Sequence, residues 1–246
     1  MIGRALAVVA VLVAVVAGAT ACTADGSAPS ASASASASAT ASPRPVSGDE
    51  AERLAVARLR AYEARVMALE ARVPVADDTL QLTGRVDLRA HDATAVVETG
   101  DGRWALLQWT QHGKALVPLA GEPDGLPDPP ADGWQVTGLV PDEPLDGALT
   151  VVLSLASDRA ENPLLLRQNG AQFVRADTVD GVDVDVFLAP GADERTDPRI
   201  RYWVDAEGLL RRVDADTGYD DPLVITLTPV TDAAVPVIPE LQALAG

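Results

Sequence analysis

The chain has 246 residues, of which 36 are Asp or Glu and 19 are Lys or Arg, so its formal net charge is −17. Such an acidic surface is repelled by phosphate backbones, which argues against nucleic acid as a partner. The hydrophobic content of 48% is too high for a disordered chain. A single Cys excludes an intramolecular disulfide and a metal site built from several cysteines.

The first 21 residues form a leader. Arg4 precedes an uncharged run from Ala5 to Ala21 that is rich in Ala, Val and Leu. This pattern is typical of a secretory signal peptide over 1–21. An uncleaved membrane helix is the marginal alternative, because spanning a bilayer takes about 20 apolar residues.

The end of the leader, Ala19-Thr20-Ala21-Cys22, resembles the lipobox of bacterial lipoproteins, in which small residues directly precede a cysteine. The resemblance implies that Cys22 receives a diacylglyceryl group and becomes the mature N-terminus. Acyl chains such as palmitate would then hold the protein on the extracytoplasmic face of the cell membrane. The alternative is an ordinary Ala-Thr-Ala cleavage site beside an unmodified cysteine.

Residues 22–48 form the lipidated Cys and a linker made almost entirely of Ser and Ala, with Pro29, Pro43 and Pro45. A segment without large side chains cannot offset its ordering entropy, so disorder is expected. About 25 flexible residues span roughly 25–30 Å. The linker therefore acts as a membrane tether, unless its repeats are neutral drift.

The folded domain is expected over 49–246 and begins with a helix. Ser47 and Glu50 have the spacing of a capping box. Behind them, apolar residues recur every three or four positions from Ala51 to Val73. This period predicts a helix of about six turns that ends at Pro74.

A period of two follows, in which Leu80, Leu82, Gly84, Val86 and Leu88 alternate with polar residues. It predicts a strand with one buried face, and further strands are expected at 93–99, 103–111 and 114–119. Residues 120–134 hold four of the 18 prolines and are expected to form a loop.

The middle of the chain favours helices. The apolar stretch 144–156 is interpreted as a helix, with a strand over 148–155 as the alternative. Asn162 as cap, Pro163 at the first helical position and Gly170 as a stop predict a second short helix.

Strands resume at 171–178, followed by Asp180-Gly181, a strong hairpin signal. Further strands are expected from Val182, at 199–206, at 209–215 and at 222–229. The predicted fold class is α+β: one curved antiparallel sheet, a half-barrel, with a long N-terminal helix and short middle helices on one face.

Catalytic and metal-binding motifs are poorly represented, so we expect no enzyme, no metal site and no cofactor. His91 and His112 lie at predicted turns, and no Gly-x-Ser-x-Gly or His-Glu-x-x-His occurs. Asp214 to Asp221 only partly matches a calcium loop, and an acidic turn is the preferred interpretation. Asp183 and Asp185 are interpreted as solvent-facing residues that pair with arginines across strands, although paired catalytic carboxylates are the alternative.

Three late segments resemble the end of the LolA/LppX/LprG-type domain of lipoproteins and periplasmic carriers. They are Val182 to Leu188, the hairpin Arg201-Tyr-Trp-Val-Asp-Ala-Glu-Gly-Leu-Leu-Arg-Arg-Val213, and Leu223 to Leu227. The resemblance extends by pattern over about residues 50–230. It implies a half-barrel sheet covered by helices, with acyl chains held between them.

Two functions remain open. The first is a membrane-anchored lipoprotein that binds or carries a lipid or other apolar ligand. The second is a cell-envelope interaction or sensory module with a filled core and an unknown protein partner. An apolar cavity of about 300–1,000 Å³ would favour the first function, and close packing would favour the second. The expected cavity lining is Leu82, Val86, Leu149, Val152, Leu153, Val184 and Val186.

Overall fold

The structure, a computed structural model, describes residues 42–190, 200–231 and 233–245. Contacts within the chain separate residues 1–39 from residues 40–246, and the description below concerns the second unit. Its strands are β1 (Arg44–Pro45), β2 (Val66–Val75), β3 (Asp78–Asp87), β4 (Asp92–Glu98), β5 (Trp104–Thr110), β6 (Gly113–Leu119), β7 (Gln135–Thr137), β8 (Gln172–Val179), β9 (Val182–Leu188), β10 (Ile200–Asp205), β11 (Leu210–Ala215) and β12 (Leu223–Pro229). Its helices are α1 (Gly48–Ala64), α2 (Pro144–Ser154), α3 (Pro163–Gln168) and α4 (Pro239–Gln242), followed by the 3-10 turn η1 (Ala243–Ala245).

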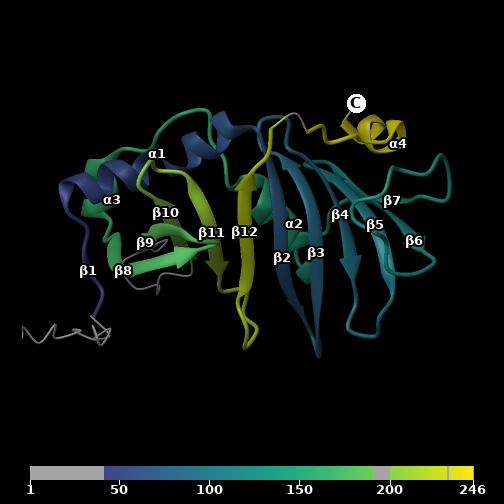
Figure 1. Cartoon of the computed structure of the whole chain (residues 1–246), viewed down its shortest axis with the longest axis horizontal. Helices are drawn as coiled ribbons and strands as arrows, with labels where there is room; N and C mark the ends of the chain where they lie inside the picture. The colour runs from purple at the N-terminus through teal and green to yellow at the C-terminus, as the bar shows by residue number, and fades with distance from the viewer. Residues whose placement is uncertain (1–41, 191–199, 232, 246) are drawn as a thin grey trace, which may run out of the picture. The chain divides into compact units, whose positions relative to one another are not determined.

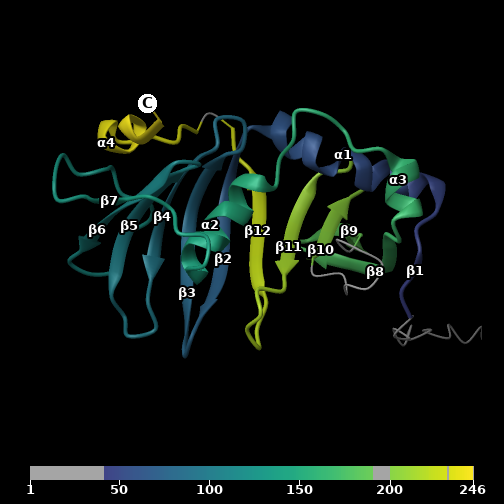
Figure 2. The same cartoon turned by 180° about the vertical axis from the view of Figure 1, so that it is seen from behind.

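The strands form a single antiparallel sheet in the order β1-β8-β9-β10-β11-β12-β2-β3-β4-β5-β6-β7. Figure 1 shows the strands side by side as one curved sheet, and Figure 2 shows α1, α2 and α3 along one face. The main core cluster contains residues of these helices and of the strand face beneath them. The predicted α+β class with one curved antiparallel sheet is confirmed.

The first helix begins as predicted and ends earlier than predicted. The Ser47 hydroxyl accepts a hydrogen bond from the Glu50 N–H at 3.3 Å, and the Glu50 carboxylate accepts one from the Ser47 N–H at 2.8 Å. At Arg65 the backbone turns to φ 66, and residues 66–75 then continue as β2.

The expectation of a six-turn helix to Pro74 was therefore wrong. Residues 66–73 also carry a period of two, since Met67, Leu69 and Val73 are buried while Glu70 and Arg72 are exposed. Antiparallel pairing with β12 on one side and β3 on the other satisfies the backbone of this segment.

The remaining predicted elements are confirmed. The strand alternative for 148–155 is wrong, because these residues belong to helix α2 and its C-terminal end. In α3, the Asn162 side chain accepts from the Leu164 N–H at 2.9 Å, and Gly170 has φ 84. Asp180 and Gly181 both have positive φ, as a two-residue hairpin turn between β8 and β9 requires.

The opposite face of the sheet is partly covered by the Pro-rich loop and the C-terminal segment, whose sequences show neither a helical nor a strand period. Trp134, which follows the Pro-rich loop, donates its indole N–H to the Pro130 carbonyl at 2.9 Å and packs on Val117. The short helix α4, which the sequence pattern did not predict, places Ile238 and Leu241 against Ala115. The Ile238 N–H donates to the buried Gln108 side chain at 2.9 Å.

The ordered domain begins earlier than the predicted boundary at residue 49. Arg44 and Pro45, which the sequence assigned to the linker, form β1 and pair with Phe173 and Gln172 of β8. Val46 is buried. Backbone pairing orders these residues although they lack a large apolar side chain of their own.

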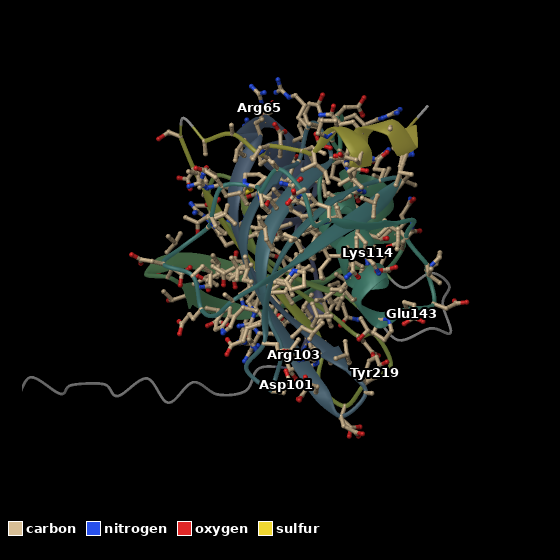
Figure 3. All side chains as sticks on the ribbon, turned by 90° about the vertical axis from the view of Figure 1, so that its right-hand side faces the viewer. Arg65, Asp101, Arg103, Lys114, Glu143 and Tyr219 are labelled. Carbon is tan, nitrogen blue, oxygen red and sulfur yellow. The ribbon has the colours of Figure 1, made fainter. Side chains whose placement is uncertain are left out.

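Several turns gather at one end of the strands. Figure 3 shows Asp101, Arg103 and Tyr219 toward this end of the molecule and Arg65 at the other. Asp77, Asp78, Asp220 and Asp221, from the β2–β3 and β11–β12 turns, line one open hollow here. This end of the sheet is therefore strongly acidic.

Candidate ligand-binding site

An apolar hollow lies where α1 and α3 cover the β10 and β11 end of the sheet. Its volume is about 70 Å³. Its lining residues come from segments far apart in the chain: Leu54, Ala57, Arg58, Glu161, Leu166, Ala189, Pro190, Tyr202 and Leu210. Most of this lining is apolar, with Arg58, Glu161 and Tyr202 as its polar side chains.

The position of α3 shapes the hollow, because Leu166 of this helix forms part of its wall. Asn162 caps the helix and Pro163 starts it, so its six residues form a compact turn that directs Leu166 inward. The segment before α3 is bonded to α1 through the backbone. Ser157 N–H donates to the Arg58 carbonyl at 3.1 Å, and Glu161 N–H donates to the Ala55 carbonyl at 2.8 Å.

Three polar groups surround the apolar lining. The Arg58 guanidinium lies 3.6 Å from the Glu161 carboxylate and also donates to the Ser154 carbonyl at 2.8 Å. Burial raises the pKa of the Tyr202 hydroxyl, and Arg58 opposes that rise. The phenol is therefore neutral at pH 7 and can donate a hydrogen bond to a ligand. Apolar walls with a few convergent polar groups are typical of small-molecule sites.

Five of the seven residues predicted to line a cavity come together elsewhere. Leu82, Val86, Leu149, Val152 and Leu153 are all buried and belong to the main core cluster under α2. None of them lines the hollow beneath α3. Their role in ligand binding stays a prediction, and their burial is that of ordinary core residues.

Val184 and Val186 lie on the other face of the sheet, which corrects the expectation that they share an inner surface with Leu149. Val186 is paired with Trp203 of β10, and both valines pack with this indole in a separate cluster. Since side chains alternate along a strand, Asp185 and Phe187 face the helices instead.

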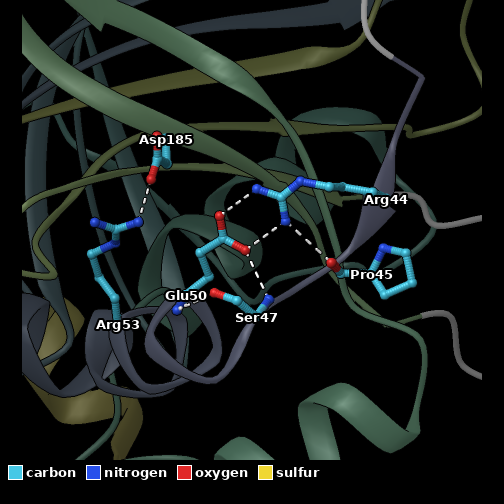
Figure 4. Close-up of polar contacts among 6 residues, drawn as sticks. All are labelled: Arg44, Pro45, Ser47, Glu50, Arg53 and Asp185. Atoms are coloured by element: carbon cyan, nitrogen blue, oxygen red, sulfur yellow. Dashed lines mark hydrogen bonds and ion pairs between the residues drawn. The ribbon is translucent and has the colours of Figure 1, made fainter.

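Figure 4 shows Asp185 directed at Arg53 of α1, with which it forms an ion pair. Asp183 and Asp185 were expected to pair with arginines on a neighbouring strand. The arginine that pairs with Asp185 lies on helix α1 instead. An ion pair that joins α1 to the sheet accounts for this carboxylate without catalysis. Arg53 also lies 5.9 Å from the centroid of the Phe187 ring.

Sequence reasoning missed the residues of the hollow. Leu54 and Ala57 are spaced three apart on α1, but the expected apolar face was traced through Ala51, Ala55 and Leu59. Glu161 and Tyr202 are polar or amphipathic residues 41 positions apart, and no local pattern connects them. The spacing of Leu54 and Ala57 was the one available signal.

Cys22 and the leader lie outside the described residues. Within the ranges that the structure describes, no cluster of three or more His, Cys, Asp or Glu side chains is placed to hold a metal. None of the helices in these ranges combines the length and apolar character needed to cross a bilayer.

No family model and no curated protein matches this chain. Solved structures do match. One is the lipoprotein LppX of Mycobacterium tuberculosis, with a TM-score of 0.44 and 14% identity over 73% of this chain and 96% of that one. Another is a domain assigned as an outer membrane lipoprotein-sorting protein from Vibrio parahaemolyticus, with a TM-score of 0.21 and 10% identity over 72% of this chain and 92% of that one.

Proposed function

We propose that this protein is an extracytoplasmic lipoprotein, anchored through Cys22, that binds the apolar part of a lipid or similar ligand in the hollow beneath α3. The observation that carries the proposal is the composition of that hollow. Leu54, Leu166 and Leu210 supply apolar walls, and Tyr202, Arg58 and Glu161 supply polar groups beside them. A ligand with an apolar chain and a polar head matches this arrangement.

The size of the hollow limits what enters it in this conformation. A volume of about 70 Å³ is well below the roughly 300–1,000 Å³ of sites that enclose a drug-sized ligand. The hollow accommodates the end of an apolar chain, and a longer stretch requires α3 to move outward. Apolar surface removed from water contributes about 25 cal/mol per Å², so affinity should rise with the length of chain buried.

The second candidate function, an envelope interaction module with a filled core, is favoured by the packing under α2. Leu149 and Val152 are 0% and 1% exposed and lie in one cluster with Leu82 and Val86. A cavity between α2 and the sheet would instead have favoured a carrier that binds its ligand beneath α2. The two functions therefore differ in whether the α3 hollow accepts a ligand.

Binding of a fluorescent acyl probe to the full-length protein tests the proposal. Ala57 is 2% exposed and lines the hollow, so Ala57→Leu should fill it and weaken probe binding with little loss of stability. Ala61 is 0% exposed on the same helix and does not line the hollow. Ala61→Leu is the matched control and should overpack the core, at a cost of about 1–3 kcal/mol.

Two results would contradict the proposal. Wild-type protein that binds no acyl probe, and that carries no lipid in native mass spectrometry, would favour the interaction module. Probe binding that Ala57→Leu leaves unchanged would place the ligand elsewhere in the molecule.

A further inference from the structure

Helix α3 presents two adjacent leucines to the outside. Leu164 and Leu165 are 56% and 51% exposed, whereas Leu166 is buried beside the hollow. Single exposed apolar residues are common on soluble proteins, whereas α3 exposes more than half of two consecutive leucines. We call Leu164 and Leu165 the α3 patch.

The α3 patch lies close to the place where the linker joins the domain. The Val46 N–H donates to the carbonyl of Ala171, three residues after α3 ends, at 3.3 Å. β1, directly before Val46, pairs with β8. Figures 1 and 2 show α3 and β1 at the same end of the sheet, opposite β7. A tether through Cys22 would therefore enter the domain beside the patch.

Charge around the α3 patch differs from the charge of the whole chain. Ion pairs join Arg44 to Glu50, Arg159 to Asp158 and Arg175 to Asp177, and Arg167 is exposed within α3. Within residues 157–170, which carry the patch, Asp158 and Glu161 are matched by Arg159 and Arg167, in a chain with a net charge of −17. The aspartates of the β2–β3 and β11–β12 turns lie at a different place on the sheet. An anionic membrane surface would repel the acidic turns more strongly than the segment 157–170.

We propose that the α3 patch docks into the interfacial region of the bilayer to which the chain is tethered, with Leu164 and Leu165 inserted among the lipids. Leu166, on the same helix, lines the hollow, so docking places the candidate ligand site beside the membrane. This inference rests on the proposed anchoring through Cys22. It adds an orientation, with the acidic turns kept from the lipid surface.

The tether makes such docking effective although the patch is small. Two leucines alone bind a bilayer weakly, but tethering raises the effective concentration of a weak binder at its target. About 20 residues separate Cys22 from the first described residue, and a random coil of this length has an r.m.s. span of roughly 25 Å. The patch therefore meets the membrane often, and weak insertion suffices to orient the domain.

Site-specific fluorescence on the full-length protein tests this orientation. Gln168 is exposed next to the patch, and Gln168→Cys carries an environment-sensitive fluorophore. The protein is reconstituted into vesicles of phosphatidylcholine and phosphatidylglycerol that contain nitroxide-labelled lipids. We expect lipid quenching of this label and none of a label at the exposed Thr217→Cys in the β11–β12 turn. Unsubstituted protein measures any signal from Cys22.

Matched substitutions separate docking from anchoring. Leu164→Ser with Leu165→Ser, in the Gln168→Cys protein, should abolish the quenching, while Val140→Ser, which removes an exposed valine elsewhere, should not. All variants should stay in the membrane fraction, and loss from that fraction would contradict the anchor instead of the docking. Two results would overturn the docking. One is equal quenching at positions 168 and 217, and the other is a label at position 168 that is shielded from water but not quenched by the nitroxide lipids. The latter would place the patch against a protein surface.

Discussion

Lys114 of β6 forms an ion pair with Asp146 of α2, whose side chain is completely buried. The other carboxylate oxygen of Asp146 accepts a hydrogen bond from the Val140 N–H at 2.8 Å. Lys114 is the sole lysine of the chain and is labelled in Figure 3. The pair joins the sheet to α2 and to the segment that precedes this helix, so one carboxylate holds three parts of the fold together.

Lys114→Met should destabilise the protein by about 3 kcal/mol, because it leaves the Asp146 charge buried without its cation. The measurement is the free energy of unfolding in urea. Adding Asp146→Asn to Lys114→Met should recover part of the loss, since it removes the unpaired charge and keeps an oxygen for Val140. Arg103→Met, which breaks an exposed pair with Asp101, is the control and should change little. Similar losses of unfolding free energy in Lys114→Met and Arg103→Met would contradict the stabilising role of the Lys114–Asp146 pair.

Acid should weaken the junction between the linker and α1. The hydrogen bond from Arg44, with help from Ser47, lowers the pKa of Glu50 from an ordinary 4.5 to about 2, against the effect of burial. A carboxyl group with a lowered folded-state pKa stabilises the protein above its unfolded pKa. This contribution is lost as the pH falls from about 4.5 to about 2. Glu50→Gln should therefore reduce the pH dependence of the unfolding free energy in this window.

Gly84→Ala should destabilise the sheet by about 3 kcal/mol. A Cβ at position 84 would meet the Thr94 carbonyl oxygen and lie 2.5 Å from the Cα of Ala95 on β4. Both obstacles are backbone atoms, so a strand would have to shift. Gly48→Ala at the start of α1 meets nothing within 4 Å and should be neutral or slightly stabilising. A thermal melt compares the two variants, and equal Tm values would contradict the close approach of β3 and β4.

Val152→Trp distinguishes a filled core from a cavity beneath α2. Because Val152 is 1% exposed in the main cluster, the larger side chain should overpack the core and cost about 1–3 kcal/mol. Acyl-probe binding should persist in the protein that remains folded, since the proposed site is the α3 hollow. A stable Val152→Trp protein that has lost probe binding would place the ligand under α2.

Cys22→Ala should move the protein from the membrane fraction to the medium, or leave it as an unprocessed precursor. The physical reason is the loss of acyl chains that each contribute roughly 0.8 kcal/mol per buried CH₂. Fractionation with detection of the protein's size measures both outcomes. Mature-sized Cys22→Ala protein that stays in the membrane fraction would contradict lipid anchoring.

The sequence by itself determined the elements whose signals are local. Alternation over 80–88, the capping box at Ser47, and the Asn162 to Gly170 helix signals each involve residues that are neighbours in the chain and in space. The hairpin at Asp180-Gly181 follows the same rule, because a tight turn needs positive φ at two adjacent positions. These signals were sufficient for the fold class.

Tertiary structure decided what local patterns left ambiguous. Residues 66–73 satisfy a helical and a strand period, and pairing with β12 and β3 selected the strand. Val184 and Val186 alternate with aspartates, but alternation alone does not show which side of the strand faces the helices. In the structure the two valines pack with Trp203 on one face, and Asp185 pairs with Arg53 of α1 on the other. The α3 hollow joins Leu54, Glu161 and Tyr202. No local pattern predicts that site, because its residues become neighbours only when α1 and α3 pack on the sheet.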